Sequence, residues 1–125
     1  MLKRAATIFG IAFIAAGILG FVPGITTAEG HLLGIFHVNA VHNVIHILSG
    51  AVALFAGYHS EYASRLYFQV FGVVYALVTL LGLFYGSSPI LGIVANNTAD
   101  VVLHAVIAAV ALYLGFAARA RTALA

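Results

Sequence analysis

Three histidines and two asparagines stand in the apolar stretch FHVNAVHNVIHILSG, residues 36–50. Positions i, i+3 and i+7 of a helix lie on one face. Two sets of polar residues follow this spacing: Asn39, His42 and His46 in this stretch, and Asn97, Asp100 and His104 further along the chain. Imidazole nitrogens and carboxylate oxygens are common protein ligands of zinc, copper(II) and iron(II). The two polar faces therefore predict a shared metal site.

The predicted ligand set takes two side chains from each helix: His42, His46, Asp100 and His104. Helical bundles commonly build metal sites from inward-facing side chains of paired helices. A charged carboxylate inside a membrane costs about 3 kcal/mol or more, so we expect Asp100 to be paired, protonated or bound to a metal. This acid favours a binding site over a purely structural role for the polar residues.

A haem b group is the second arrangement that the residues allow. His46 and His104 are expected at equal depth on opposed helices, where two imidazoles can serve as axial ligands. In either arrangement Asn39, Asn43 and Asn97 are the predicted outer-shell partners, because a hydrogen bond from a second residue orients a ligating imidazole. The cofactor itself, whether Zn, Cu, Fe or haem, is left open by the sequence.

A structural alternative stays open beside both cofactor arrangements. Asparagine and histidine in membrane helices also form interhelical hydrogen bonds, which contribute about 0.6 kcal/mol on average. A proton relay or a small-ligand pocket is a third use for such residues. The polar faces therefore predict either a binding site or a device that sets the helix register.

The elements that must position these residues are membrane spans. Only 6 % of the 125 residues are charged, against about 25 % in soluble domains, and the mean hydropathy is +1.15. Four apolar runs reach the roughly 20 residues that a span needs, at 5–22, 37–57, 65–85 and 97–118. The predicted fold class is an all-α integral membrane four-helix bundle, a single domain over residues 1–125.

Composition and missing motifs exclude several classes of function. The absence of cysteine excludes disulfides, iron–sulfur clusters and covalently attached haem. Five basic residues are too few for a nucleic-acid surface. The chain has no nucleophile elbow, phosphate loop or dinucleotide fingerprint, so the sequence does not favour an independent enzyme and predicts no catalytic residue.

An internal repeat links the two polar faces. A shift of 58 positions lays LGIFHVNAVHNVIHILSGAVALFAG over LGIVANNTADVVLHAVIAAVALYLG with eleven of twenty-five residues identical. We therefore expect two tandem two-helix repeats, at about 5–58 and 63–118. Because each repeat has two spans, both repeats enter the membrane in the same orientation, related by a pseudo-two-fold axis along the membrane normal.

The basic residues predict the orientation in the membrane. They stand at the N-terminus, in the middle loop and at the C-terminus: Lys3, Arg4, Arg65, Arg119 and Arg121. By the positive-inside rule, both termini are expected in the cytoplasm. The other two loops, each with an apolar LGI turn, then face outward, and these turns are expected either to lie in the interface or to dip back toward the bundle.

The segments GHLLGIFHVNAVHNVIHILSGAVALFAG, RLYFQVFGVVYALVTLLGL and NTADVVLHAVIAAVALYLGF resemble the bacterial membrane family catalogued as domain of unknown function 4383. The resemblance covers roughly residues 5–116, and HVNAVHN and NTAD are its most specific parts. It implies a small four-span protein of the bacterial inner (cytoplasmic) membrane. The family carries no assigned ligand residues.

Two functions are therefore predicted side by side. In the first, the lipid-embedded bundle binds a transition metal or haem at the seam between the second and fourth spans. In the second, it is a structural or accessory subunit of a larger membrane complex, or of a homo-oligomer, and its polar residues only fix helix register. Neither function involves nucleic acid.

Overall fold

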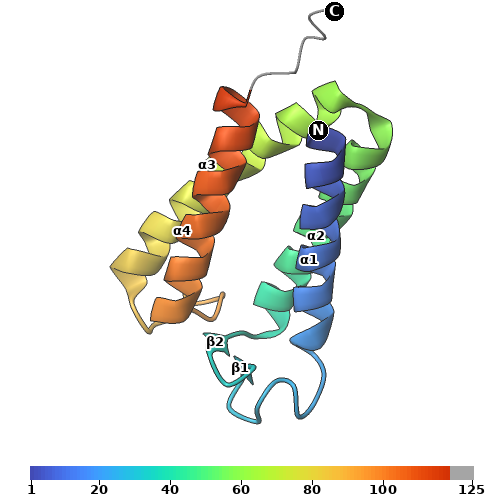
Figure 1. The fold of residues 1–125 in the computed structure, drawn as a ribbon. Coiled ribbons are helices and arrows are strands. Elements are labelled where there is room, and N and C mark those ends of the chain that lie inside the picture. The colour runs from blue at the N-terminus through green and yellow to red at the C-terminus, as the bar shows by residue number, and fades with distance from the viewer. Residues whose placement is uncertain (119–125) are drawn as a thin grey trace, which may run out of the picture.

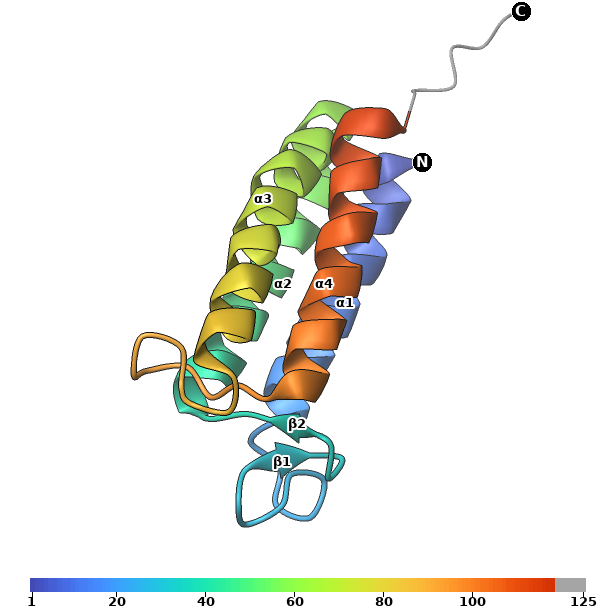
Figure 2. The same ribbon diagram turned by 90° about the vertical axis from the view of Figure 1, so that its left-hand side faces the viewer.

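The computed structural model describes residues 1–118, and four long helices account for most of them (Figure 1). Their bounds are α1 Leu2–Leu19, α2 Ala40–His59, α3 Glu61–Tyr85 and α4 Thr98–Leu112, the last continued by a π-helical turn, η1 Tyr113–Ala117. The predicted all-α four-helix bundle is confirmed. The start of α1 and the end of η1 lie at the same end of the bundle (Figure 2).

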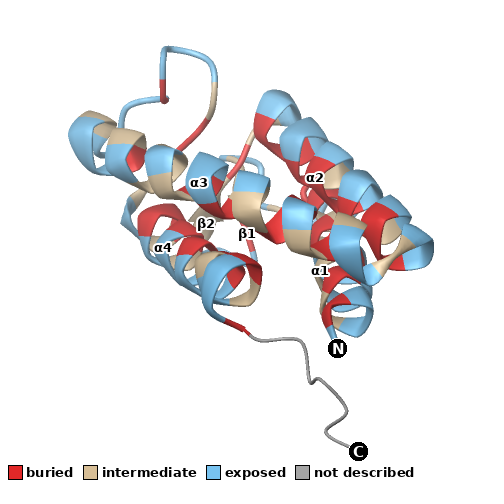
Figure 3. Cartoon of the chain, turned by 90° about the horizontal axis from the view of Figure 1, so that it is seen from above, coloured by how far each residue is buried: buried red, intermediate tan, exposed pale blue. Residues whose placement is uncertain are grey.

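All four helices are long and apolar enough to cross a membrane. Their outward faces carry large apolar side chains, such as Leu48, Leu80 and Phe84, that are more than half exposed. Seen along the bundle, buried positions face inward and exposed positions face outward (Figure 3). In water this surface would be unfavourable, whereas lipid solvates it, so the chain is a multi-pass membrane protein.

Polar caps explain where the helices begin. The side-chain oxygens of Asn39, Ser60 and Asn97 accept hydrogen bonds from main-chain N–H groups three residues later, at the starts of α2, α3 and α4. Such caps satisfy donors that the first helical turn leaves free. Because Ser60 alone separates α2 from α3, the middle loop is shorter than the sequence predicts, and α3 begins at Glu61 instead of residue 65.

Close backbone approach holds the first helix pair together. A Cβ atom on Gly50 of α2 would lie 2.7 Å from the carbonyl oxygen of Gly10 on α1. A side chain at either position would push the helices apart. Small residues are enriched at membrane helix interfaces because they allow this close approach. The molecule is thus built as two packed hairpins, α1 with α2 and α3 with α4.

The two LGI segments form turns of the same backbone shape. In the first, strands β1 His31–Leu32 and β2 Phe36–His37 pair across Leu33 and Gly34, whose φ angles are +55° and +72°. The second turn, between α3 and α4, has φ angles of +54° and +73° at Leu91 and Gly92. Two successive residues with positive φ make a tight turn that favours pairing of the flanking strands. Both turns lie at the end of the bundle opposite to the start of α1 (Figure 2).

Candidate metal centre

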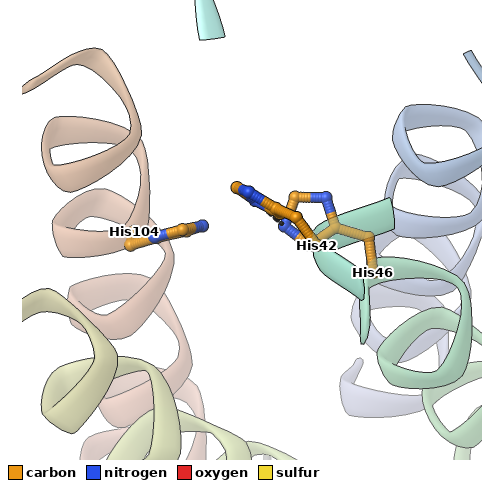
Figure 4. A group of neighbouring side chains, drawn as sticks. All are labelled: His42, His46 and His104. Atoms are coloured by element: carbon orange, nitrogen blue, oxygen red, sulfur yellow. Dashed lines mark hydrogen bonds between the residues drawn. The ribbon is translucent and has the colours of Figure 1, made fainter. Parts of the chain in front are cut away.

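Three histidines meet at the seam between the two hairpins. His42 and His46 project from α2 and His104 from α4, and the three rings point toward one another (Figure 4). One ring nitrogen of each lies within 4.8 Å of the others. All three side chains are at least 95 % buried, at 2 %, 5 % and 3 % exposure. The tertiary structure therefore brings together three of the four predicted ligands.

His42 is oriented by the main chain. Its Nδ1 lies 2.8 Å from the carbonyl oxygen of Ala95, which can only accept, so Nδ1 carries the proton and donates. In a neutral imidazole the other nitrogen, Nε2, then keeps its lone pair. A ligating histidine is commonly held by such a bond from its second nitrogen. The loop before α4 thus orients the His42 ring, whereas the sequence predicts asparagines in that position.

The spacing of the α2 histidines suits a common ion. Their Nε2 atoms are 3.2 Å apart. Two nitrogens bound to one tetrahedral zinc at 2.0–2.1 Å are about 3.3 Å apart. The separation of the pair therefore matches that of two nitrogens on one ion. Without an ion the same distance is a hydrogen bond in which His46 donates to His42.

His104 is the residue that hydrogen bonding leaves unexplained. Neither of its ring nitrogens has a hydrogen-bond partner within residues 1–118, and both atoms are buried. His46 Nδ1 is in the same condition. A buried polar atom without a partner costs about 1–3 kcal/mol, so such atoms are uncommon and call for an explanation. An ion bound by the three rings would satisfy one of the two His104 nitrogens.

Asp100 lies in the first turn of α4 and takes part in a local cap. Its Oδ2 accepts from the main-chain N–H of Asn97 at 3.0 Å, while Asn97 Oδ1 accepts from the N–H of Asp100 at 3.0 Å. This reciprocal pair is a capping box, and the positive end of the helix dipole also favours a carboxylate there. The carboxylate is not part of the three-histidine group. The acid that the sequence assigned to the metal therefore has a structural partner.

The asparagines lie between the hairpins or beside the histidines. Asn39 Nδ2 donates to the carbonyl of Ile93 at 2.9 Å, and Asn97 Nδ2 donates to the carbonyl of Ile35 at 2.9 Å. Each cap thus also ties its helix to the turn of the other hairpin. The third residue, Asn43, is buried against α1 and its Oδ1 has no partner in the described part of the chain. Side-chain hydrogen bonds between the hairpins therefore include those of Asn39, Asn97 and His42.

A cavity of about 260 Å³ adjoins the three histidines between α2 and α3. Its wall includes Ser49 and Tyr75, whose hydroxyl oxygens are 2.9 Å apart, and the Tyr75 ring lies 5.6 Å from that of His104. Ser49 continues the polar face of α2 in the sequence, whereas Tyr75 was not predicted as a site residue. A signal was present, since Tyr75 falls in the middle of a span, where a hydroxyl needs a partner, whereas most other tyrosines fall near span ends.

A porphyrin fits this geometry poorly. The ring centroids are separated by 4.5 Å for His42 and His46, 5.6 Å for His42 and His104, and 5.8 Å for His46 and His104. The three imidazoles form a compact triangle, so the His42 ring occupies space that a flat macrocycle between the other two rings would need. The arrangement favours a single ion over haem.

The chain was compared with protein families, curated proteins and solved structures. It matches the family model described as Domain of unknown function (DUF4383) over residues 3–117, in agreement with the resemblance noted in the sequence. No curated protein and no solved structure matches it. Since the family model covers almost the whole chain, this four-helix membrane protein belongs to the DUF4383 family.

Proposed function

We propose that the protein binds one divalent transition-metal ion through the imidazoles of His42, His46 and His104, inside the membrane. The observation that carries the proposal is His104, a buried imidazole with no partner for either nitrogen, within 4.8 Å of two others. Three imidazoles suit zinc, copper(II) or iron(II). Such a set leaves a coordination position open, as in zinc sites that bind a further ligand.

The three-imidazole set replaces the four-donor set that the sequence favoured. Asp100 Oδ2 would join the ion only by leaving its capping box, which would free the main-chain N–H of Asn97 at the start of α4. Asn39 and Asn97 act indirectly in this proposal. Because they tie α2 and α4 to the opposite turns, they hold the two hairpins, and so the three imidazoles, in register.

We also propose that the bundle is a duplicated hairpin with a pseudo-two-fold axis between α2 and α4. The two crossed asparagine bonds support this, because donors and acceptors are both 58 residues apart. Ring packing supports it as well: Phe13 of α1 packs on His46 at 5.5 Å, and Tyr75 of α3 packs on His104 at 5.6 Å. The metal would then lie close to the axis, where ligands from both repeats converge.

The same charge pattern supports a topology with both termini in the cytoplasm of a bacterial cell. Lys3 and Arg4 at the start of α1 and Arg65 near the start of α3 lie at one end of the bundle. The cytoplasmic face of bacterial inner membranes is the side that retains basic loops. Arg119 and Arg121 complete the pattern in the sequence and lie outside the described residues.

Metal titration of the detergent-purified protein tests the proposal. After treatment with a chelator, the protein is loaded with Zn²⁺ or Co²⁺ and its metal content is measured by elemental analysis. We expect one ion per chain in the parent, loss of the ion in His104→Ala, and retention in His59→Ala, a matched variant at an exposed histidine. Equal metal content in all three proteins would contradict the proposal and favour the function as an accessory subunit.

A further inference from the structure

A second binding feature lies at the opposite end of the bundle from the turns. A pocket of about 990 Å³ opens between the start of α1 and the start of α3, and its wall includes Arg4, Tyr62 and Arg65. The acid in this wall, Glu61, accepts from the main-chain N–H groups of Leu2 at 3.0 Å and Lys3 at 3.2 Å. Glu61 also pairs with the N-terminal ammonium of Met1 at 3.0 Å, and within residues 1–118 no carboxylate pairs with either arginine, so the pocket presents two unpaired guanidinium groups.

Arg65 is held in place from the far side of the pocket. Its Nη1 donates to the carbonyl of Gly115 at 3.1 Å, in the π-helical turn that follows α4. A guanidinium has five N–H donors, so this bond leaves others free. Arg4 is exposed and belongs to a different helix. Arg4 and Arg65 thus line the same pocket from two different helices.

An apolar groove continues from this pocket toward the bundle centre. It has a volume of about 310 Å³ and lies between α1 and α4, with Ala12, Phe13 and Ala16 on one wall and Leu103 and Ile107 on the other. Ile8 lines both the pocket and the groove, so the two features adjoin at this side chain. The inner end of the groove reaches His46.

The dimensions match one membrane leaflet. Arg4, Ile8, Ala12 and Ala16 follow one another at intervals of four, so each side chain neighbours the next in a row that winds slowly around α1. At 1.5 Å per residue, the distance from Arg4 to Ala16 is about 18 Å, close to half of the roughly 30 Å hydrocarbon core. A molecule filling both parts needs an anionic head and an apolar chain about one leaflet long.

We propose that an anionic glycerophospholipid binds here, with its phosphate between Arg4 and Arg65 and one acyl chain in the groove between α1 and α4. Guanidinium groups bind phosphate through paired N–H donors, and the small side chains of Ala12 and Ala16 leave room for the chain. The acyl chain ends against His46 and Phe13. The lipid thus packs against one wall of the histidine cluster, although its binding does not depend on a metal.

Native mass spectrometry tests this site. The protein is reconstituted in vesicles of equal parts phosphatidylglycerol and phosphatidylcholine, extracted in a mild detergent, and weighed with its retained lipids. We expect one phosphatidylglycerol per chain in the parent. Arg4→Gln should lower its retention about fivefold, the effect of about 1 kcal/mol per basic residue. Lys3→Gln, which removes the same charge outside the pocket, should leave retention unchanged.

A second pair of variants tests the groove. Ala12→Phe fills it and should abolish retention of phosphatidylglycerol, whereas Ala15→Phe, on an exposed position outside the groove, should not. Thermal unfolding of both variants shows that each is folded. Equal losses in Lys3→Gln and Arg4→Gln, or equal retention of the two lipids by the parent, would overturn the proposal in favour of diffuse attraction. Full competition by inorganic phosphate would overturn it in favour of a free-anion site.

Discussion

Asn39 combines two interactions whose contributions to stability are separable. Its Oδ1 caps α2 by accepting from the N–H of His42 at 3.0 Å, and its Nδ2 donates to the carbonyl of Ile93 at 2.9 Å. A cap of this kind contributes about 1 kcal/mol and a neutral hydrogen bond about 1 kcal/mol. We expect Asn39→Ala to lower the free energy of unfolding by about 2 kcal/mol. Asn39→Ser should lower it by about 1 kcal/mol, because serine caps equally well but does not reach Ile93.

The assay is reversible unfolding in mixed micelles, with SDS as denaturant and helical circular dichroism as the signal. Ser60→Ala is the matched control, because Ser60 caps α3 through the N–H of Ala63 at 2.9 Å without a bond to the other hairpin's turn. This control should cost about 1 kcal/mol. Asn97→Ser removes the reciprocal bond to Ile35 and should cost as much as Asn39→Ser.

The same variants connect stability to metal binding. His42 and His46 belong to one hairpin and His104 to the other, so loosening the ties between the turns should weaken metal affinity. The double variant Asn39→Ser/Asn97→Ser should therefore bind zinc more weakly than either single variant. The reasoning would be refuted if Asn39→Ser unfolds like the parent protein, since the cross-hairpin bond would then contribute nothing.

Three further outcomes follow from the local geometry. Asp100→Asn keeps an oxygen acceptor for the N–H of Asn97, so its free energy of unfolding should stay within about 0.5 kcal/mol of the parent value and its metal content should not change. Loss of the ion on elemental analysis would make Asp100 a ligand. Gly50→Ala should lower the free energy of unfolding in SDS by about 1–3 kcal/mol, because its Cβ would meet the Gly10 carbonyl at 2.7 Å. Ala51→Ser, at an exposed position, is the control, and an equal loss of stability in the two variants would argue against close packing. Bound zinc should dissociate in equilibrium dialysis as the pH falls from about 8 to about 5, because protons compete for the imidazole lone pairs. Zinc retention that does not change with pH would count against histidine ligands.

The polar residues show how far a helical pattern predicts a site. The spacing of His42 and His46 is local to one helix, so the sequence places both on one face. Their meeting with His104 was expected from the internal repeat, and the structure brings the three rings together. The role of Asp100 was also readable, because an asparagine three residues before an acid at a helix start is typical of a capping box. The same residue type at this position is therefore consistent with a cap as well as with a metal ligand.

By itself, the sequence determined the membrane class, the four spans, the polar faces and the family, because hydropathy and helical spacing act over neighbouring residues. Only the tertiary structure decided which polar side chains are left without partners. The bond from His42 to the Ala95 carbonyl depends on the loop between α3 and α4, and the crossed asparagine bonds depend on both turns. Main-chain acceptors have no sequence pattern, so their positions follow from the folded backbone alone. Once they are placed, Asn39, Asn97 and Asp100 have hydrogen-bond partners, whereas Asn43 Oδ1 and the imidazole nitrogens of His104 have none within residues 1–118.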